Sequence, residues 1–314
     1  MGEKLVSVAV MAYNQENEVK KALDSILFQR CNFEVEIVTG VDLSRDNTMR
    51  VIQTYIETAP DFVHYVPIFH DKHVGEQVNI VSILKKCTGK YIAFLDADDY
   101  WNDEDKLQKQ VDIMENNPLI GVVYTDDYFE SRAFDHPIER RRDSPWENVF
   151  TQMLMGCPIT TETAMFRKDL LDFVEYDVML EKKFLVEDDF LWLELANHTQ
   201  FYHLNEFTAT ATLTRPTIFD YNVPLMSAEY DKHVTDIKLF YLEKYPEKTH
   251  LTKTDILDRH YQVWIKAALM CHKKKTALEN LKKIVNKSRY HKTLVLLFKI
   301  PLGFNFYMLP KNLI

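Results

Sequence analysis

Short apolar runs alternate with amphipathic stretches through residues 1–125, and this alternation limits the folds open to the chain. The apolar runs have the length of buried strands and lie at 5–12, 34–39, 63–69, 91–95 and 122–125. The stretches between them have helical spacing and lie at 16–28, 46–56, 75–87 and 103–116. This pattern predicts βαβ units, so we expect an α/β fold with a mostly parallel sheet covered by helices. We also expect Asp46 to cap the second helix and Gly89 to end the third.

The remainder of the chain is less regular. Residues 126–143 are polar and charged, which predicts a long loop. Strands are predicted at 160–166 and 206–215, and helices at 187–197, 226–245, 254–271 and 276–289. We therefore expect a main domain over 1–220, with halves 1–125 and 126–220, and a helical region over 221–314.

Glycine is scarce, and its placement excludes two kinds of nucleotide site. The chain has 7 glycines, and the closest pair, Gly75 and Gly89, lies 14 residues apart. Neither the G-x-G-x-x-G fingerprint nor the G-x-x-x-x-G-K-[ST] loop can be written with that spacing. If the protein binds a nucleotide, a group other than a glycine-rich loop must hold the phosphates.

Cysteine usage and hydropathy indicate a cytoplasmic location. The 4 cysteines have no C-x-x-C spacing, which speaks against a zinc site and a disulfide framework. The first residues lack the apolar stretch of a secretory signal, and no run of 18 apolar residues predicts a transmembrane helix.

The net charge of −9 is unevenly distributed. Residues 272–299 contain nine Lys or Arg and one acid, which gives +8 there and −17 elsewhere. An acidic body does not offer the basic footprint of a nucleic-acid-binding protein. The basic stretch and the apolar residues after it suggest that 272–314 contacts an anionic membrane surface. The alternative is a solvated pair of helices packed on the main domain.

Polar residues follow the ends of the predicted parallel strands, where open α/β sheets bind ligands. The sharpest group is Asp96-Ala97-Asp98-Asp99 after the fourth strand. Three carboxylates in four residues repel one another unless a cation or solvent screens them, and Mg²⁺ or Mn²⁺ favours such oxygen ligands. The alternative is a solvated acidic turn that begins the next helix.

A second acidic group, Glu187-Asp188-Asp189, begins a predicted helix. Acidic residues favour helix N-termini through the helix dipole, which explains the group without any function. A carboxylate that faces a cleft would instead serve as a general base.

Taken in order, these segments resemble a known family. VSVAVMAYN (6–14), EIVTGVDLSRDNT (36–48), GKYIAFLDADDYW (89–101) and EDDFLW (187–192) are similar to family 2 glycosyltransferases of the GT-A fold. The resemblance extends over roughly residues 5–215 and departs from the family pattern at Val41 and Leu43, where an aspartate and a glycine are common. It implies a GT-A domain over 1–220, with a nucleotide-sugar-binding half at 1–125 and an acceptor half at 126–220.

The resemblance also assigns roles to residues. It implies Asp98 as the ligand of a divalent metal and Asp188 as the catalytic base. Glu187, Trp101 and Arg215 would face the acceptor cleft. The residues implied in binding the donor nucleotide are Ala12, Tyr13, Asn14, Asp42, Asp71, Asp96 and Ala97.

The activity implied is that of an inverting hexosyltransferase. It would move a sugar from a nucleotide-diphosphate donor, a UDP-sugar, to a hydroxyl of a glycan or lipid-linked acceptor, with Mn²⁺ or Mg²⁺ as cofactor. The location implied is the cytoplasm, peripheral at the inner face of the plasma membrane. Two alternatives stay open: a haloacid-dehalogenase-like phosphatase that uses Asp96 and Asp98, and a non-catalytic nucleotide-binding scaffold.

Overall fold

The computed structural model describes residues 4–58, 63–131, 135–142, 148–213 and 224–299. The chain divides into two compact units, Met1–Thr214 and Arg215–Ile314. The boundary predicted at residue 220 lies outside the described residues.

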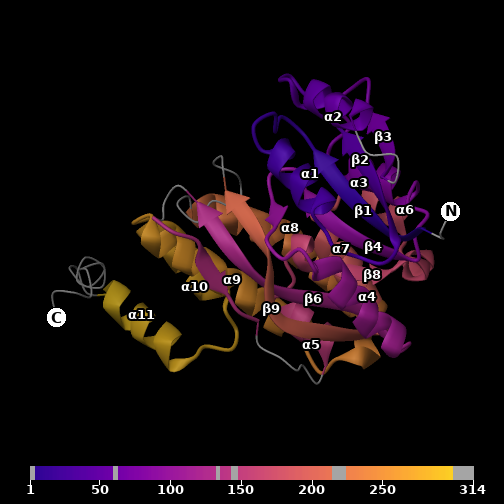
Figure 1. The fold of residues 1–314 in the computed structure, drawn as a ribbon. Coiled ribbons are helices and arrows are strands. Elements are labelled where there is room, and N and C mark those ends of the chain that lie inside the picture. The colour runs from indigo at the N-terminus through magenta and orange to yellow at the C-terminus, as the bar shows by residue number, and fades with distance from the viewer. Residues whose placement is uncertain (1–3, 59–62, 132–134, 143–147, 214–223, 300–314) are drawn as a thin grey trace. The chain divides into compact units, whose positions relative to one another are not determined.

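The first unit is built on one mixed sheet (Figure 1). Its strands are β1 (Lys4–Ala12), β2 (Glu34–Val41), β3 (His64–Phe69), β4 (Tyr91–Asp96), β5 (Tyr100–Trp101), β6 (Ile120–Ser131), β7 (Ile138–Arg140), β8 (Met165–Arg167) and β9 (Gln200–Leu213). They are ordered β3-β2-β1-β4-β8-β6-β9-β5, and β7 pairs with β6. The strands β3, β2, β1 and β4 are parallel, as the alternation predicts, and the α/β fold class is confirmed.

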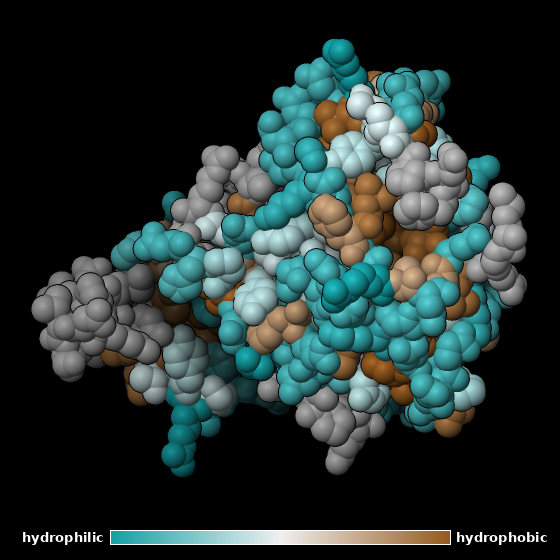
Figure 2. All heavy atoms as spheres, in the orientation of Figure 1, coloured by the Kyte–Doolittle hydropathy of each residue, from teal (hydrophilic) through white to brown (hydrophobic). Residues whose placement is uncertain are grey.

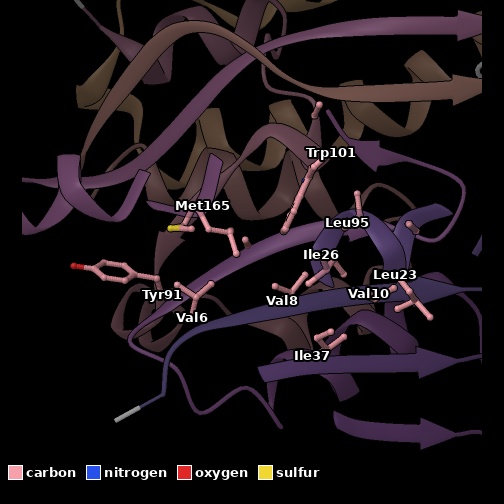
Figure 3. Packing of buried hydrophobic residues seen from close by; sticks show 14 of the residues in the cluster. Val6, Val8, Val10, Leu23, Ile26, Ile37, Tyr91, Leu95, Trp101 and Met165 are labelled. Atoms are coloured by element: carbon pink, nitrogen blue, oxygen red, sulfur yellow. The ribbon is translucent and has the colours of Figure 1, made fainter. Parts of the chain in front are cut away.

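Helices connect these strands and cover the sheet. They are α1 (Val19–Leu27), α2 (Thr48–Glu57), α3 (Glu76–Leu84), α4 (Lys106–Asn116), α5 (Val149–Met155), α6 (Tyr176–Glu181) and α7 (Glu187–Leu195), with the 3₁₀ turns η1 (Thr161–Thr163) and η2 (Lys168–Phe173). The main core lies between β1, β2 and β4 on one side and α1 and α4 on the other. Figure 3 shows its central side chains, among them Val6, Val8, Val10, Leu23, Ile26, Tyr91 and Leu95.

Two local predictions at helix ends were wrong. Asp46 is not the N-cap of α2: Asn47 holds that position, and Asp46 Oδ1 accepts a hydrogen bond from Thr48 N at 3.0 Å. Gly89 does not end α3, which stops at Leu84. A Cβ on Gly89 would lie 2.6 Å from the backbone nitrogen of Ser7, so the glycine permits close approach to β1 instead.

The sheet also departs from the prediction beyond β4. β8 lies antiparallel between β4 and β6, so the fifth predicted strand does not pair directly with the fourth. The predicted loop at 126–143 is wrong in its first part, because β6 continues to Ser131 and pairs with β7. The predicted strand at 160–166 is a 3₁₀ turn that leads into β8.

The second unit is helical where it is described. It contains α8 (Pro224–Lys244), η3 (Pro246–Lys248), α9 (Lys253–Met270), α10 (Lys274–Lys283) and α11 (Arg289–Lys299). The helix predicted over 276–289 corresponds to α10 and ends earlier, at Lys283, and α11 begins at Arg289. Among the described residues, no helix is both long and apolar enough to cross a membrane. The face of the molecule in Figure 2 is mostly hydrophilic, with smaller hydrophobic areas between the polar ones.

Candidate functional site

The loops after β1 and β2 are joined by hydrogen bonds. The carbonyl of Ala12 accepts from Asp42 N at 3.0 Å. Asn14 has a φ of 54°, in the left-handed region that asparagine tolerates better than most residues. Its backbone nitrogen donates to Ser44 Oγ at 3.1 Å, and its Oδ1 accepts from Arg45 N at 2.7 Å. These bonds fix the two strand ends relative to each other.

Asp42 is the anchor of this part of the site. Its side chain is 4% exposed, and His73 Nδ1 lies 2.7 Å from its Oδ2. Oδ1 accepts from the backbone nitrogens of Leu43 and Val74, both at 2.8 Å, and Oδ2 accepts from Gly75 N at 2.9 Å. Burial works to raise the pKa of Asp42, but these three hydrogen bonds and the charge of His73 outweigh it and lower the pKa below its usual range.

An aromatic pair lies beside this carboxylate. The ring of Tyr13, 40% exposed, faces His73 with 4.9 Å between centroids. Asp71 lies exposed in the same loop, and His73, two residues later, makes the contact with Asp42. The sequence analysis missed His73 because an isolated histidine carries no spacing signal. Its position after the third strand was the only indication.

The acidic turn, Asp96-Ala97-Asp98-Asp99, begins at the last residue of β4. Ala97 is fully buried, and Asp99 N donates to the carbonyl of Asp96 at 3.0 Å, which closes the turn. Thr212 of β9 holds the turn from the other side: its backbone nitrogen donates to Asp99 Oδ1 at 2.7 Å, and its hydroxyl donates to the carbonyl of Asp98.

The carboxylates around this turn repel one another. The pKa of Asp96 lies well above its usual range, first because of burial and then because of the charges of Asp98 and Glu187. Glu162 and Glu76 add smaller contributions of the same sign to the pKa of Asp96. These residues come from the acidic turn, α3, η1 and α7, so the fold gathers acidic groups from four segments into one region.

Asp188 and Glu187 begin α7. Asp188 Oδ1 accepts from Asp189 N at 2.8 Å, and its Oδ2 accepts from Thr161 Oγ1 at 3.2 Å. Burial raises the pKa of Asp188, although both hydrogen bonds act in the opposite direction. Burial also raises the pKa of Glu187 to about 8, with further contributions from the charges of Asp188 and Glu76.

Glu76 is affected by the charges of both the acidic turn and Asp188. Desolvation raises the pKa of Glu76, followed by the charges of Asp188, Asp98 and Asp42 in that order. Because the side chain of Glu76 is itself exposed, these neighbours act on it across a space that solvent can enter. Sequence reasoning missed Glu76, which is the first residue of α3.

This donor set fits a divalent cation. Mutual repulsion and raised pKa values are the signs of carboxylates that a cation would stabilise. Among the residues that the structure describes, no three His, Cys, Asp or Glu side chains form a ready metal site. Mg²⁺ is usually held by one or two carboxylates and completed by substrate phosphates, so a preformed protein cage is not required.

A buried layer supports η1 from beneath. Trp101 Nε1 donates to the carbonyl of Glu162 at 2.9 Å, and Gln110 Nε2 donates to the carbonyl of Thr163 at 2.9 Å. Lys106 is fully buried, and its Nζ donates to Gln110 Oε1 at 2.7 Å. Trp101 is 4% exposed, so the structure places it beneath η1 and not on the surface of an acceptor cleft. Arg215 lies outside the described residues.

A buried ion cluster flanks the same turn. Asp127 of β6 pairs with both Arg140 and Arg142. Arg142 Nη2 also donates to Thr160 Oγ1 at 3.1 Å, and Arg140 lies 3.7 Å from Glu162. Burial and the charge of Asp127 raise the pKa of Glu162 to about 7, against the effect of the two arginines. These pairs explain why acidic residues predicted to lie in a loop are buried in a strand.

Comparison with known proteins places the chain in a family. Residues 7–173, just over half of the chain, match the Glycosyl transferase family 2. An uncharacterized protein of Mycobacterium tuberculosis is 33% identical over 145 residues, which are 44% of this chain and 41% of that protein. The UDP-Glc:alpha-D-GlcNAc-diphosphoundecaprenol beta-1,3-glucosyltransferase WfaP of Escherichia coli is 27% identical over 248 residues, 76% of this chain and 92% of WfaP.

Solved structures share the fold. Residues 1–349 of Staphylococcus aureus TarS, in complex with UDP-GlcNAc, superpose with a TM-score of 0.55 at 14% identity, covering 97% of this chain and 89% of that TarS chain. The mannosyltransferase PcManGT of Pyrobaculum calidifontis, in complex with GDP-Man and Mn²⁺, gives a TM-score of 0.52 at 17% identity, with 98% and 87% coverage. The family match spans the acidic turn, which decides against the haloacid-dehalogenase alternative. The chain belongs to glycosyl transferase family 2 and has the GT-A fold.

Proposed function

We propose that this protein is an inverting hexosyltransferase. It transfers a sugar from a nucleotide-diphosphate donor, a UDP-sugar, to a hydroxyl of a glycan or lipid-linked acceptor. The placement of acidic groups carries the proposal: the acidic turn begins at the end of β4, Thr161 of η1 donates to Asp188, and the charges of Asp98 and Asp188 both raise the pKa of Glu76. The names of WfaP, TarS and PcManGT and their ligands support the class of reaction.

The donor nucleotide is proposed to bind at the ends of β1 and β2. Tyr13 offers an exposed ring for stacking against a base, and the buried Asp42 carboxylate would hold the loop of His73 and Gly75 beside that ring. Ala12, Asn14 and Asp71 are proposed to border the base and ribose, and Asp96 and Ala97 the diphosphate.

Asp98 is the proposed ligand of Mn²⁺ or Mg²⁺. When bound, such a cation neutralises the negative charge that develops on the departing nucleotide diphosphate. The structure of PcManGT with Mn²⁺ and GDP-Man supports a divalent ion in this fold. In the absence of a glycine-rich loop, the phosphates would be held through a cation on this carboxylate.

Asp188 is the proposed general base. Its two hydrogen bonds orient the carboxylate, and its raised pKa brings its basicity closer to that needed for proton abstraction near neutral pH. It would take the proton of the acceptor hydroxyl as that oxygen attacks the anomeric carbon. Attack on the face opposite the leaving group inverts the configuration.

The acceptor is proposed to be carried on a lipid at the inner face of the plasma membrane. The name of WfaP includes a diphosphoundecaprenol acceptor, and WfaP is matched over most of its length. A cytoplasmic enzyme that contacts the membrane peripherally would meet such a substrate.

Replacement of Asp188 by Asn tests the assignment. UDP-glucose and UDP-GlcNAc are offered with Mn²⁺ or Mg²⁺ and a lipid-linked acceptor, and released UDP is measured. We expect Asp188→Asn to lower turnover by about 10²–10⁴-fold while donor affinity is kept, because only the proton acceptor is removed. Asp177→Asn, an exposed acid in the first turn of α6, is the matched control. Turnover by Asp188→Asn at the wild-type rate would refute the role.

A further inference from the structure

The outer face of α11 combines cationic and apolar side chains. We define the α11 surface as Arg289, Tyr290, Lys292 and Leu296 of α11 together with Val285 in the segment before it, all exposed. Val285 is 70% exposed, Leu296 62% and Tyr290 48%, which are high values for large apolar or aromatic side chains. In the lower left of Figure 2, where Figure 1 places α11, hydrophobic and hydrophilic groups lie next to one another.

These apolar residues are not needed to attach α11. A separate set of side chains forms the local core with α9 and α10, namely Ile265, Ala268, Leu269, Ala277, Leu281, Ile284 and Leu294. Along α11, Arg289, Lys292 and Leu296 follow a spacing of three and four residues and share one face, whereas His291 and Leu294 are buried. The helix therefore packs with one side and presents a second, mixed side to solvent.

The basic residues at the starts of α10 and α11 are not explained by helix stability, whereas Lys282 and Lys283 lie in the last turn of α10, where the helix dipole favours them. α10 begins at Lys274 with Lys273 as its N-cap, and α11 begins at Arg289, with no acid in the first turn of either helix. Cations near a helix N-terminus oppose the helix dipole, so these positions weaken the helices slightly. Residues 272–299 nevertheless hold nine basic side chains and one acidic one in a chain whose remainder carries −17.

We propose that the α11 surface binds an anionic lipid surface. Lysine and arginine near a membrane are attracted by anionic headgroups, while exposed apolar side chains enter the boundary between headgroups and acyl chains. A polyanion in water would use the cations and leave Val285 and Leu296 without a role. The inference concerns where the enzyme resides and holds whichever donor or acceptor the active site uses.

Flotation of the full chain with lipid vesicles tests this binding. Vesicles of phosphatidylcholine alone are compared with vesicles that also contain phosphatidylglycerol, at low and high ionic strength. We expect binding to the anionic vesicles only, with a loss of affinity as salt is added. Equal binding to both kinds of vesicle, or to neither, would overturn the proposal.

Two sets of variants separate the contributions. Arg289→Gln with Lys292→Gln should lower vesicle affinity by about 25-fold, since each cation near the surface contributes about fivefold. Val285→Ser with Leu296→Ser should also lower affinity but retain the salt dependence. Lys85→Gln with Lys86→Gln, two exposed lysines after α3, is the matched control and should bind as the wild type does.

Two further outcomes decide the identity of the partner. Variants that bind as tightly as the wild type would refute the role of α11, and circular dichroism would establish that they are folded. If the protein binds a DNA or RNA oligomer as tightly as anionic vesicles, and Val285→Ser with Leu296→Ser has no effect, the surface recognises polyanions and the lipid assignment is wrong. Failure of sugar transfer leaves these measurements unaffected, so the two proposals fail separately.

Discussion

Replacement of Lys106 by Met is expected to stabilise the first unit, and to do so more at low pH than at high pH. Lys106 is fully buried, and burial lowers its pKa from 10.5 to about 7, against the opposing charges of Glu162 and Asp103. The unfolded chain therefore binds more protons than the folded chain between pH 7 and pH 10.5, so the stability of the wild type rises with pH through that window.

The magnitude follows from this change in pKa. At 1.36 kcal/mol for each tenfold change, the lowered pKa of Lys106 disfavours folding by about 5 kcal/mol at pH 6 and by about 2 kcal/mol at pH 9. Methionine fills a similar volume without a charge. It also removes the hydrogen bond to Gln110 Oε1, which lowers stability by about 1–3 kcal/mol at either pH. The difference between the two pH values, about 3 kcal/mol, is independent of that loss.

Urea unfolding at pH 6 and pH 9, followed by tryptophan fluorescence, measures the effect, because Trp101 lies next to Lys106. The wild type should gain about 3 kcal/mol more than Lys106→Met between the two pH values. Lys85→Met, at an exposed position, controls for the exchange of side chain itself. If the wild type and Lys106→Met gain equally between pH 6 and pH 9, Lys106 does not titrate in that range and the reasoning is refuted.

Two further substitutions test the site. Thr161→Val removes a hydrogen bond that lowers the pKa of Asp188. The acidic limb of the pH profile of kcat/KM should therefore move to higher pH, and kcat/KM should fall a few-fold at pH values below that limb. An unchanged profile would show that Thr161 does not influence the base. Asp42→Asn replaces a carboxylate that accepts from three backbone amides, so it should lower stability by about 1–3 kcal/mol at neutral pH and weaken the binding of UDP, measured by calorimetry. Because the pKa of Asp42 is lowered in the folded state, the stability difference from wild type should shrink as the pH falls below 3.8, and a constant difference would contradict this.

Local hydrophobic patterning was sufficient to predict the parallel half of the sheet. Buried parallel strands need continuous apolar runs, and 91–95 and its counterparts supply them. Once those strands are parallel, their carboxyl ends meet at one edge. The sequence order therefore places Tyr13, Asp42 and the acidic turn together without knowledge of any side-chain contact.

The loop predicted from residue 126 onward was wrong because of two acidic residues. Asp126 and Asp127 have the polarity of a loop, yet both are fully buried in β6. Their partners, His203 on Asp126 and the two arginines on Asp127, lie on other segments. A buried charge is tolerated when it is paired, and pairing across 13 to 77 residues has no local signature.

The sequence by itself determined the fold class, the succession of the first four strands along the chain and the carboxylates at their ends. It could do so because burial periodicity and chain order are local properties. Only the tertiary structure decided that His73 pairs with Asp42, that Thr161 orients Asp188, and that Lys106 lies buried beneath η1. Each of these contacts depends on a side chain reaching a partner on another element. Such meetings are set by the packing of helices on the sheet, which the pattern of any single segment does not contain.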